Sequence, residues 1–415
     1  MKKLLPFLLL LAACQPQQVA KPAATTTAPA YLNAAYAPAQ HQPSVASMTA
    51  MGRAMFFEPS LSVSGKLSCA SCHSPDHAYG PPNSLAVQLG GPGLNDMGTR
   101  AAPSLRYLQN APSFTEHFHD DDGDDSIDAG PTGGRNWDGR ARSGHEQALT
   151  PLLSKHEMGN FDAAAVLARL QHGPLAAQFR KTYGENIFEQ PEQALRWALM
   201  SLEVFQESPA DFYPYTSKYD AFLRKQVKLS PQELRGLALF NDETKGNCAA
   251  CHISQIAPGG AFPQFTDYGL INIGVPRNNQ LPANADPQYF DMGLCGPERT
   301  DLTDHREYCG SFKTPTLRNV ALRQRFFHNG SFTSLEQVLR FYVQRDTAPQ
   351  KWYPKNPDGR VHKYDDLPPG LEANVNAEPP FNRKKGQAPA LSEKEIADVI
   401  VFLKTLTDGY VVKGA

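Results

Sequence analysis

The sequence has no excess of either charge, because 40 Lys and Arg residues stand against 42 Asp and Glu residues in a chain of 415. Proteins that bind nucleic acid carry a basic patch or stripe, and nothing in this composition indicates one. Long apolar runs are also lacking, since the run from Leu4 to Leu11 is far shorter than the roughly 20 residues of a membrane-spanning helix. The composition, 41% apolar, therefore predicts a globular chain with two or three hydrophobic cores, no nucleic-acid partner and no spanning helix.

The first residues resemble a bacterial lipoprotein signal. Lys2 and Lys3 precede the short apolar run, and Leu11-Ala12-Ala13-Cys14 is typical of the lipobox at which such signals are cut. We therefore expect residues 1–14 to be the signal, with Cys14 lipidated as the first mature residue, and the Ala- and Pro-rich residues 15–44 to be a flexible tether. The body is then expected in the periplasm, held at the outer membrane by this lipid alone. Ordinary signal cleavage without a lipid is the alternative.

Four of the seven cysteines lie in two CxxCH motifs. This motif is the attachment signature of c-type heme, in which both thiols bind the heme vinyl groups and the histidine binds the iron. A zinc site would need further paired ligands, and a redox CxxC would be expected in a βαβ unit; neither context is visible. The sequence therefore predicts two covalently bound hemes, with attachment and iron-binding residues Cys69, Cys72 and His73 for the first and Cys248, Cys251 and His252 for the second.

Two further cysteines, Cys295 and Cys309, lie close together in the sequence. An oxidising compartment favours a disulfide between them. The alternative is a pair of free buried thiols.

The sequence around each heme motif repeats. Before the first, a helix near 51–58 carries Gly52, and before the second, Ser230-Pro231-Gln232-Glu233 predicts a capped helix with a glycine at 236. Each half also has a later amphipathic helix, one beginning at Pro191 and one at Ser392. The sequence predicts a mainly α fold of two cytochrome c-like domains, residues 45–225 and 226–415, with the boundary inside 208–229, where prolines cluster.

Several longer motifs accompany the two CxxCH motifs. They are Trp137-Asp138-Gly139-Arg140-Ala141, Glu146-Gln147-Ala148, Glu157-Met158-Gly159, Phe312-Lys313-Thr314-Pro315-Thr316-Leu317-Arg318-Asn319-Val320 and Phe327-His328-Asn329-Gly330-Ser331-Phe332. With these segments, the chain resembles the bacterial di-heme cytochrome c peroxidases and their MauG-type relatives from about residue 45 to the end.

The resemblance implies a role for each of three residues. The N-terminal heme would react with peroxide, with Glu157 as acid/base on its distal side and Gln147 beside it, while Trp137 would lie between the hemes. Elementary chemistry agrees, because cleaving an O–O bond needs a group that takes a proton from one oxygen and returns it to the other. Taken singly, each residue could instead be a surface Glu, a capping Gln or a core Trp.

Tyr342 separates the two branches of the family. It lies on a helix predicted to start at Ser334, where Ser334 and Gln337 would form a capping box. Leu335, Val338 and Leu339 lie on the same face of this helix as Tyr342. Classical peroxidases carry a Met ligand to the C-terminal heme at this place, whereas MauG-type members carry Tyr. A phenolate ligand lowers the potential of the iron, and a Met ligand raises it. A core tyrosine near the heme edge is the alternative.

Two departures from the peroxidase branch also bear on function. Residues 84–100 contain no His, so the histidine that caps the resting N-terminal heme in that branch is missing, which favours an open heme. The interdomain calcium of the family uses an Asn before a Pro-Thr pair, and the matching stretch in this chain, residues 99–104, has none. Calcium is therefore an open question, as it is for the acidic run at 120–125, which is expected to be a surface loop.

The sequence favours a MauG-like di-heme enzyme over two alternatives. It would react with hydrogen peroxide at the N-terminal heme and draw electrons through the Tyr-ligated C-terminal heme from an electron-donor protein or a protein substrate. The first alternative is a cytochrome-c peroxidase that detoxifies peroxide with a small electron-donor protein. The second is a non-enzymatic di-heme electron-transfer cytochrome, against which Glu157 and the missing loop histidine argue.

Overall fold

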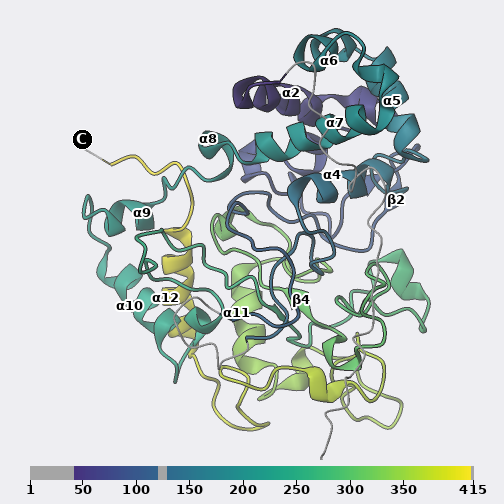
Figure 1. The fold of residues 1–415 in the computed structure, drawn as a ribbon. Coiled ribbons are helices and arrows are strands. Elements are labelled where there is room, and N and C mark those ends of the chain that lie inside the picture. Colours follow the sequence, from purple (N-terminus) through teal and green to yellow (C-terminus); the bar gives the residue numbers. More distant parts are fainter. Residues whose placement is uncertain (1–41, 120–128, 413–415) are drawn as a thin grey trace, which may run out of the picture.

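The computed structural model describes residues 42–119 and 129–412. The expected signal peptide, the lipidation site Cys14, most of the tether and the acidic run lie outside the described residues. Within them the chain is mainly helical, as predicted, and its strands form two small antiparallel pairs (Figure 1). No helix of the described part is long and apolar enough to span a membrane.

Helical segments make up most of the regular structure. The α-helices are α2 (Val45–Phe57), α3 (Cys69–Cys72), α4 (Gly144–Leu153), α5 (Ala163–His172), α6 (Ala176–Tyr183), α7 (Pro191–Gln206), α8 (Pro209–Phe212), α9 (Lys218–Leu223), α10 (Pro231–Asn241), α11 (Leu335–Gln344) and α12 (Glu393–Lys404). The 3-10 helices are η1 (Pro59–Leu61), η2 (Pro75–His77), η3 (Ile187–Glu189), η4 (Cys248–Ala250), η5 (Pro282–Ala285), η6 (Arg306–Tyr308), η7 (Val320–Leu322), η8 (Pro349–Lys351) and η9 (Glu372–Asn374). Strand β1 (Leu89–Gly90) pairs with β2 (Asp96–Met97), and β3 (Leu270–Ile271) pairs with β4 (Phe312–Lys313).

The first hydrophobic core is built on the crossing of α2 and α7. A Cβ atom at Gly52 would lie only 1.8 Å from the carbonyl oxygen of Ser201 on α7, so only glycine allows this approach. Gly52 thus marks a close contact between the two helices. Apolar residues between Met48 and Phe212 fill this core, and α4, α5 and α6 pack around it.

The second core repeats this arrangement with α10 and α12. A Cβ atom at Gly236 would lie 2.1 Å from the Asp398 carbonyl oxygen. Helices α10 and α12 begin with complete capping boxes, of which the first joins Ser230 and Glu233. The box predicted for α11 is only half formed, because Ser334 caps the Gln337 N–H while the Gln337 side chain accepts from Thr333 instead.

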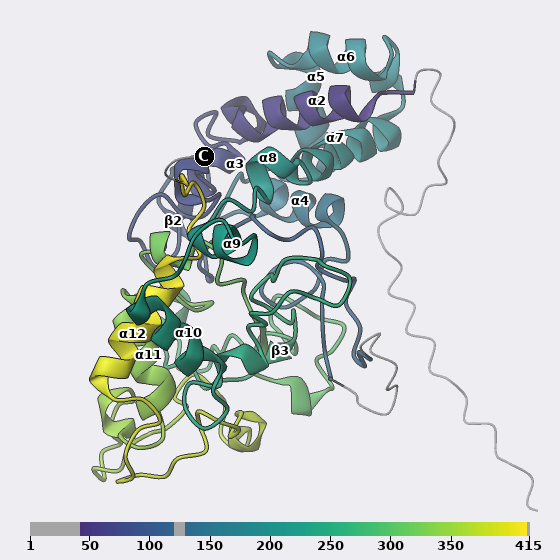
Figure 2. The same ribbon diagram turned by 90° about the vertical axis from the view of Figure 1, so that its left-hand side faces the viewer.

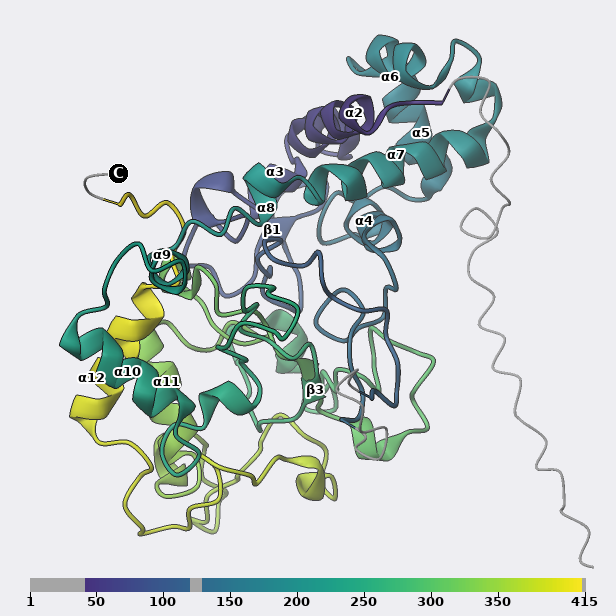
Figure 3. The same ribbon diagram turned by 60° about the vertical axis from the view of Figure 1, so that its left-hand side comes forward.

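The helices that build the two cores form two groups, which lie at opposite ends of the molecule (Figures 2 and 3). The first group holds α2, α5, α6 and α7, and the second holds α10, α11 and α12. The change from one core to the other falls between Tyr213 and Tyr219, inside the boundary region predicted at 208–229. Helix α9 packs into the second core, although the division at 225 assigns it to the first half. The C-terminal segment returns to the first half, where Asp408 pairs with Arg106 and Tyr107.

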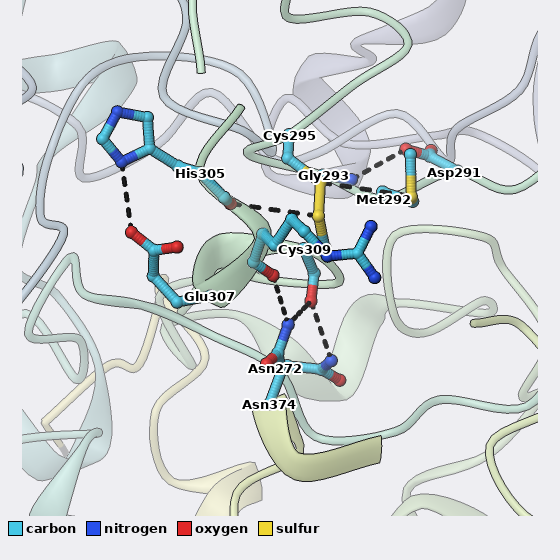
Figure 4. Close-up of a disulfide and its surroundings, with 10 residues drawn as sticks. Asn272, Asp291, Met292, Gly293, Cys295, His305, Glu307, Cys309 and Asn374 are labelled. Carbon is cyan, nitrogen blue, oxygen red and sulfur yellow. Dashed lines mark hydrogen bonds and ion pairs between the residues drawn. A yellow bond between two sulfur atoms is a disulfide. The ribbon is translucent and has the colours of Figure 1, made fainter. Parts of the chain in front are cut away.

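Cys295 and Cys309, for which the sequence predicts a disulfide, are joined by one in the structure. Figure 4 shows the Cys309 carbonyl oxygen accepting hydrogen bonds from the side chains of Asn272 and Asn374, both at 3.2 Å. The disulfide loop is therefore tied both to the end of β3 and to η9.

Candidate active site

The first CxxCH motif forms the one-turn helix α3 and its C-cap. The backbone N–H of His73 closes this turn on the Cys69 carbonyl oxygen at 2.9 Å, which brings the histidine back beside the two cysteines. The thiols of Cys69 and Cys72 form no disulfide, and burial, with a smaller contribution from the nearby Glu157 carboxylate, raises the pKa of each to about 12. The turn thus presents two unpaired thiols and an imidazole on one side, as heme attachment requires.

His73 is oriented by the chain that follows it. Its Nδ1 lies 3.1 Å from the Tyr79 carbonyl oxygen, which can only accept, so Nδ1 carries the proton and Nε2 keeps its lone pair. Burial lowers the pKa of His73 to about 4, and the ring is therefore neutral near pH 7. A neutral imidazole with a free Nε2 is the form that binds iron.

The second motif has the same geometry. His252 is buried, its Nδ1 donates to the Phe265 carbonyl oxygen at 2.9 Å, and burial lowers its pKa to about 4. Cys248 and Cys251 are unpaired and lie on η4 and its C-cap. Both donor sets therefore fit a c-type heme.

Glu157 follows α4 in a tight turn and faces the first motif. Its backbone is held from the other side by β1, since Gly91 donates to the Glu157 carbonyl oxygen at 2.8 Å and a Cβ atom at Gly90 would lie 2.7 Å from its Cα. The side chain is open to solvent on one side, but the protein around it desolvates the carboxyl and raises its pKa, an effect that Ser154 partly offsets. The structure thus places Glu157 near Cys72 with the protonation behaviour of an acid/base group.

One cavity joins residues of both halves. Gln147, Trp137 and Tyr342, which the sequence associates with the reaction, all line it, together with Cys251 and His252 of the second motif. The cavity therefore connects the second motif with Trp137 and Gln147, whereas Cys69, Cys72 and His73 of the first motif, and Glu157, are not part of its lining.

Trp137 is fixed at the contact of the two halves. Its side chain is buried, and the indole Nε1 donates to the Ala101 carbonyl oxygen at 2.7 Å. Its own carbonyl oxygen accepts from the backbone of Lys313 on β4, also at 2.7 Å. The indole is therefore held by a hydrogen bond within the N-terminal half, while the Trp137 backbone is bonded to the C-terminal half.

Tyr342 projects from α11 into the cavity beside the second motif. Burial, and then the neighbouring Cys251 and Cys248 thiols, raise the pKa of its phenol. Its ring is held between Phe327 and Phe381, with centroid distances of 6.1 and 5.3 Å. Among the described residues no hydrogen bond of its hydroxyl is found, so nothing in that part of the chain competes for the oxygen.

A buried ion cluster next to Trp137 is a feature that sequence reasoning missed. The Arg100 guanidinium binds both carboxylate oxygens of Asp291 at 2.7 Å and reaches Asp138 at 2.6 Å. Arg140 also pairs with Asp138 at 2.7 Å, and Arg299 donates to its backbone carbonyl oxygen. Arg100 and Arg140 lower the pKa of Asp138, and Arg100 lowers that of Asp291. The only sequence signal is the position of Asp138 directly after Trp137.

The same region does not fit a calcium ion. The Ala101 carbonyl oxygen already accepts from Trp137, and the Ala102 carbonyl oxygen accepts from Arg323 at 3.2 Å. The carboxylates nearby are neutralised by Arg100. Within residues 42–119 and 129–412, no three His, Cys, Asp or Glu side chains gather in a way that could hold a metal ion.

In the segment from 312 to 332, one residue that lines the cavity has a ring nitrogen without a hydrogen-bond partner among the described residues. Arg318 binds Asp220 through two hydrogen bonds, and Asn319 binds Asp408, so both are engaged in holding the second core together. His328 stacks on Phe312 at 3.5 Å, and its buried Nε2 has no partner in the described protein. This nitrogen is available to a polar group bound in the cavity.

Comparisons with known proteins agree with this geometry. Residues 46–228 match the family model described as di-haem cytochrome c peroxidase. The methylamine utilization protein MauG of Paracoccus denitrificans is 31% identical over 381 residues, which is 89% of this chain and 90% of that protein. The cytochrome c551 peroxidase of Nitrosomonas europaea is 27% identical over 72% of this chain and 73% of its own length.

A solved structure is similar over the same extent. The diheme peroxidase BthA from Burkholderia thailandensis superimposes with a TM-score of 0.77 at 37% identity, over 88% of this chain and 87% of that one. The shared helical fold thus accompanies the shared motifs along most of both chains. This chain belongs to the di-haem cytochrome c peroxidase family and is a heme-dependent oxidoreductase of the peroxidase type.

Proposed function

We propose that this enzyme is a MauG-like di-heme peroxidase with two covalently attached c-type hemes. The N-terminal heme, on Cys69, Cys72 and His73, would take hydrogen peroxide. The C-terminal heme, on His252 and with Tyr342 as its second axial ligand, would pass electrons inward. When bound, the hemes supply iron centres that accept the oxidising equivalents of peroxide.

At the N-terminal site, Glu157 performs the proton transfer. Its carboxylate takes a proton from one peroxide oxygen and returns it to the other, which becomes water. The raised pKa of Glu157 supports this role, because a carboxyl that is half protonated closer to neutral pH can both accept and donate. Gln147 would hydrogen-bond the peroxide without changing charge.

Between the two sites, Trp137 would relay electrons. Its burial, the hydrogen bond of its indole to Ala101 and the bond of its backbone to Lys313 of the other half support this role, since together they fix the indole in place. The neighbouring carboxylate of Asp138 is neutralised by arginines, so the indole does not lie beside an unpaired charge.

The observation that carries the MauG-like interpretation is the position of Tyr342. Its phenol lies beside the second pair of cysteines, with its hydroxyl unengaged by the described residues and aromatic rings on both sides. A side chain that ligates a metal cation loses its proton more easily than the free side chain, so the phenol can bind as an anion. A phenolate ligand makes this heme a poor port for a high-potential donor and better suited to holding an oxidising equivalent.

Electrons would therefore come from a protein partner that docks at the surface. A protein substrate oxidised on a side chain fits the low potential better than a small soluble donor does. The second candidate is a peroxide-detoxifying cytochrome-c peroxidase, which is favoured by the relatives of that name at 26–27% identity. The enzyme would act in the periplasm, tethered by a lipid at Cys14.

The spectrum of the ferric holoenzyme tests the proposal. We expect one high-spin and one low-spin heme, with the low-spin signal altered in Tyr342→Met and unchanged in Tyr353→Phe. Tyr353 is a suitable control because it is a buried tyrosine of the same half whose hydroxyl donates to the Gly274 carbonyl oxygen. Two low-spin hemes that do not react with peroxide would refute the proposal and favour an electron-transfer cytochrome.

A further inference from the structure

The two histidine-bearing loops differ at one buried position. In each half, a residue with positive φ presents its carbonyl oxygen to Nδ1 of the heme histidine: Tyr79 (φ 54°) to His73, and Phe265 (φ 55°) to His252. Both side chains are almost fully buried, at 1% and 0% exposure. Tyr79 and Phe265 therefore occupy equivalent places, and one carries a hydroxyl that the other lacks.

The packing around the two rings is the same. Tyr79 contacts Phe56 of α2 and Phe205 of α7, with centroid distances of 5.7 and 6.4 Å. In the second half, Phe265 makes the matching contacts with Phe240 of α10 at 6.2 Å and with Phe402 of α12 at 6.3 Å. Phenylalanine thus fills this position without loss of packing, and the hydroxyl of Tyr79 is not needed for the fold.

The Tyr79 hydroxyl has a proton acceptor in place. It donates to Asp211 at 2.7 Å, and the Asp211 side chain is 32% exposed and pairs with Arg53 near the surface. The Tyr79 hydroxyl is therefore hydrogen-bonded to a carboxylate that reaches the protein surface.

The acidity of an oxidised phenol decides the form that an oxidised Tyr79 can take. The Arg106 guanidinium, 5.9 Å from the ring centroid, is paired with Asp408, and Arg53 is paired with Asp211, so neither places an uncompensated charge beside the ring. A phenol that has lost an electron is far more acidic than the phenol itself, so the electron and the phenolic proton leave together. Asp211 is positioned to accept that proton.

We propose that Tyr79 is a redox-active residue of the N-terminal site, with Asp211 as its proton acceptor. This inference rests on the proposed function. When no external donor is at hand, the Tyr79 phenol gives up one electron, for which the heme that His73 would hold, once oxidised by peroxide, would be the one-electron acceptor. The O–H bond breaks, its proton binds a carboxylate oxygen of Asp211, and a neutral phenoxyl remains. One electron from a reductant at the surface and the return of the proton restore the phenol.

The test is paramagnetic resonance of the full-length holoenzyme, freeze-quenched after stoichiometric peroxide without reductant. We expect a radical signal that narrows when tyrosine is ring-deuterated, that is lost in Tyr79→Phe and that persists in Tyr107→Phe. Tyr107 is the matched control, because it is equally buried and donates to Asp408 at 2.7 Å. The optical bands of the oxidised heme are expected to last longer in Tyr79→Phe.

A second variant guards against a folding defect. Asp211→Asn keeps the Tyr79 ring and an accepting oxygen but cannot take a proton, so it should lower the radical yield. If the wild type gives no tyrosyl signal, or if the signal is unchanged in Tyr79→Phe, the inference about Tyr79 fails while the proposed function stands. If peroxide leaves the optical spectrum of the wild type unchanged, the proposed function fails and this inference fails with it.

Discussion

The Arg100 guanidinium, in the N-terminal half, binds both carboxylate oxygens of Asp291, in the C-terminal half, at 2.7 Å. The same guanidinium reaches Asp138, directly after Trp137, at 2.6 Å. All three side chains are at most 9% exposed. This pairing therefore joins the two halves at the residue expected to connect their hemes.

Replacing this guanidinium should strongly destabilise the fold. Arg100→Met removes one partner of two buried carboxylates, and leaving a buried charge unpaired typically costs about 3–5 kcal/mol. The free energy of unfolding of the holoenzyme in urea measures this. In Arg142→Met, which breaks an exposed pair with Glu146, the loss should stay below about 1 kcal/mol. Equal losses in both variants would contradict the role of the cluster.

The same cluster predicts a pH dependence. Arg100 lowers the pKa of Asp138 and Asp291 in the folded protein. The stabilisation by these groups is therefore fully present above the pKa of the unfolded carboxyls, near 4, and is lost as the pH falls through the folded values. Urea unfolding at pH 3 and pH 6 should thus show a smaller difference for Arg100→Met than for the wild type.

A chelator such as EDTA should leave the melting temperature unchanged.

Glu157→Gln should slow the reaction with peroxide by about 10²–10⁴-fold, because the amide cannot accept the proton. Stopped-flow absorbance of the ferric holoenzyme measures the rate. In the wild type the rate should fall with decreasing pH, with a midpoint above the ordinary glutamate pKa of about 4.3, because the pKa of Glu157 is raised. The half-buried Glu146, which pairs with Arg142, provides the control Glu146→Gln, which should react at the wild-type rate. Equal rates in both variants would remove Glu157 from the mechanism.

Trp137→Phe should separate the two hemes electronically and also cost stability. The Ala101 carbonyl oxygen loses its partner, which costs about 1–3 kcal/mol for a buried acceptor. After peroxide, the optical change of the C-terminal heme should lag behind that of the N-terminal heme. Trp352→Phe is the control, because its indole N–H has no partner among the described residues. Simultaneous changes in Trp137→Phe would argue against the relay.

Tyr342→Met should raise the reduction potential of the C-terminal heme, since a neutral thioether stabilises ferrous iron relative to a phenolate. Axial ligands tune heme potentials over roughly 0.8 V, so we expect a shift on the order of 0.1 V or more. Spectroelectrochemical titration measures both potentials. The potential of the N-terminal heme should change little and thus serves as the internal control. An unchanged C-terminal potential would indicate that Tyr342 only packs near the heme.

The Cys295→Ala/Cys309→Ala double variant should lose about 3 kcal/mol of stability, because the disulfide closes a loop over 14 residues and removes that much chain entropy from the unfolded state. Thermal unfolding with and without a thiol reductant measures it. The reductant should lower the melting temperature of the wild type but not that of the double variant. A reductant-insensitive wild type would show that the disulfide does not contribute.

The sequence was informative wherever a feature depends on residues close along the chain. The capping boxes at Ser230 and Ser392 are readable because both partners lie three residues apart, and Gly52 and Gly236 are readable because a helix periodicity surrounds them. The half-formed cap of α11 shows where such patterns fail. Thr333 and Ser334 can both donate to the Gln337 side chain, and the sequence pattern does not tell which of them does.

The CxxCH motifs, the helix starts and the family resemblance were therefore determined by the sequence alone. Only the tertiary structure decided that Arg100 meets Asp291, 191 residues away, and that Tyr79 and Phe265 hold equivalent places. These contacts depend on the path of long loops with residues of positive φ, and no periodicity encodes such a path. Local hydrogen bonds have a short range along the chain, whereas ion pairs and ring contacts form wherever packing of the whole chain brings the groups together.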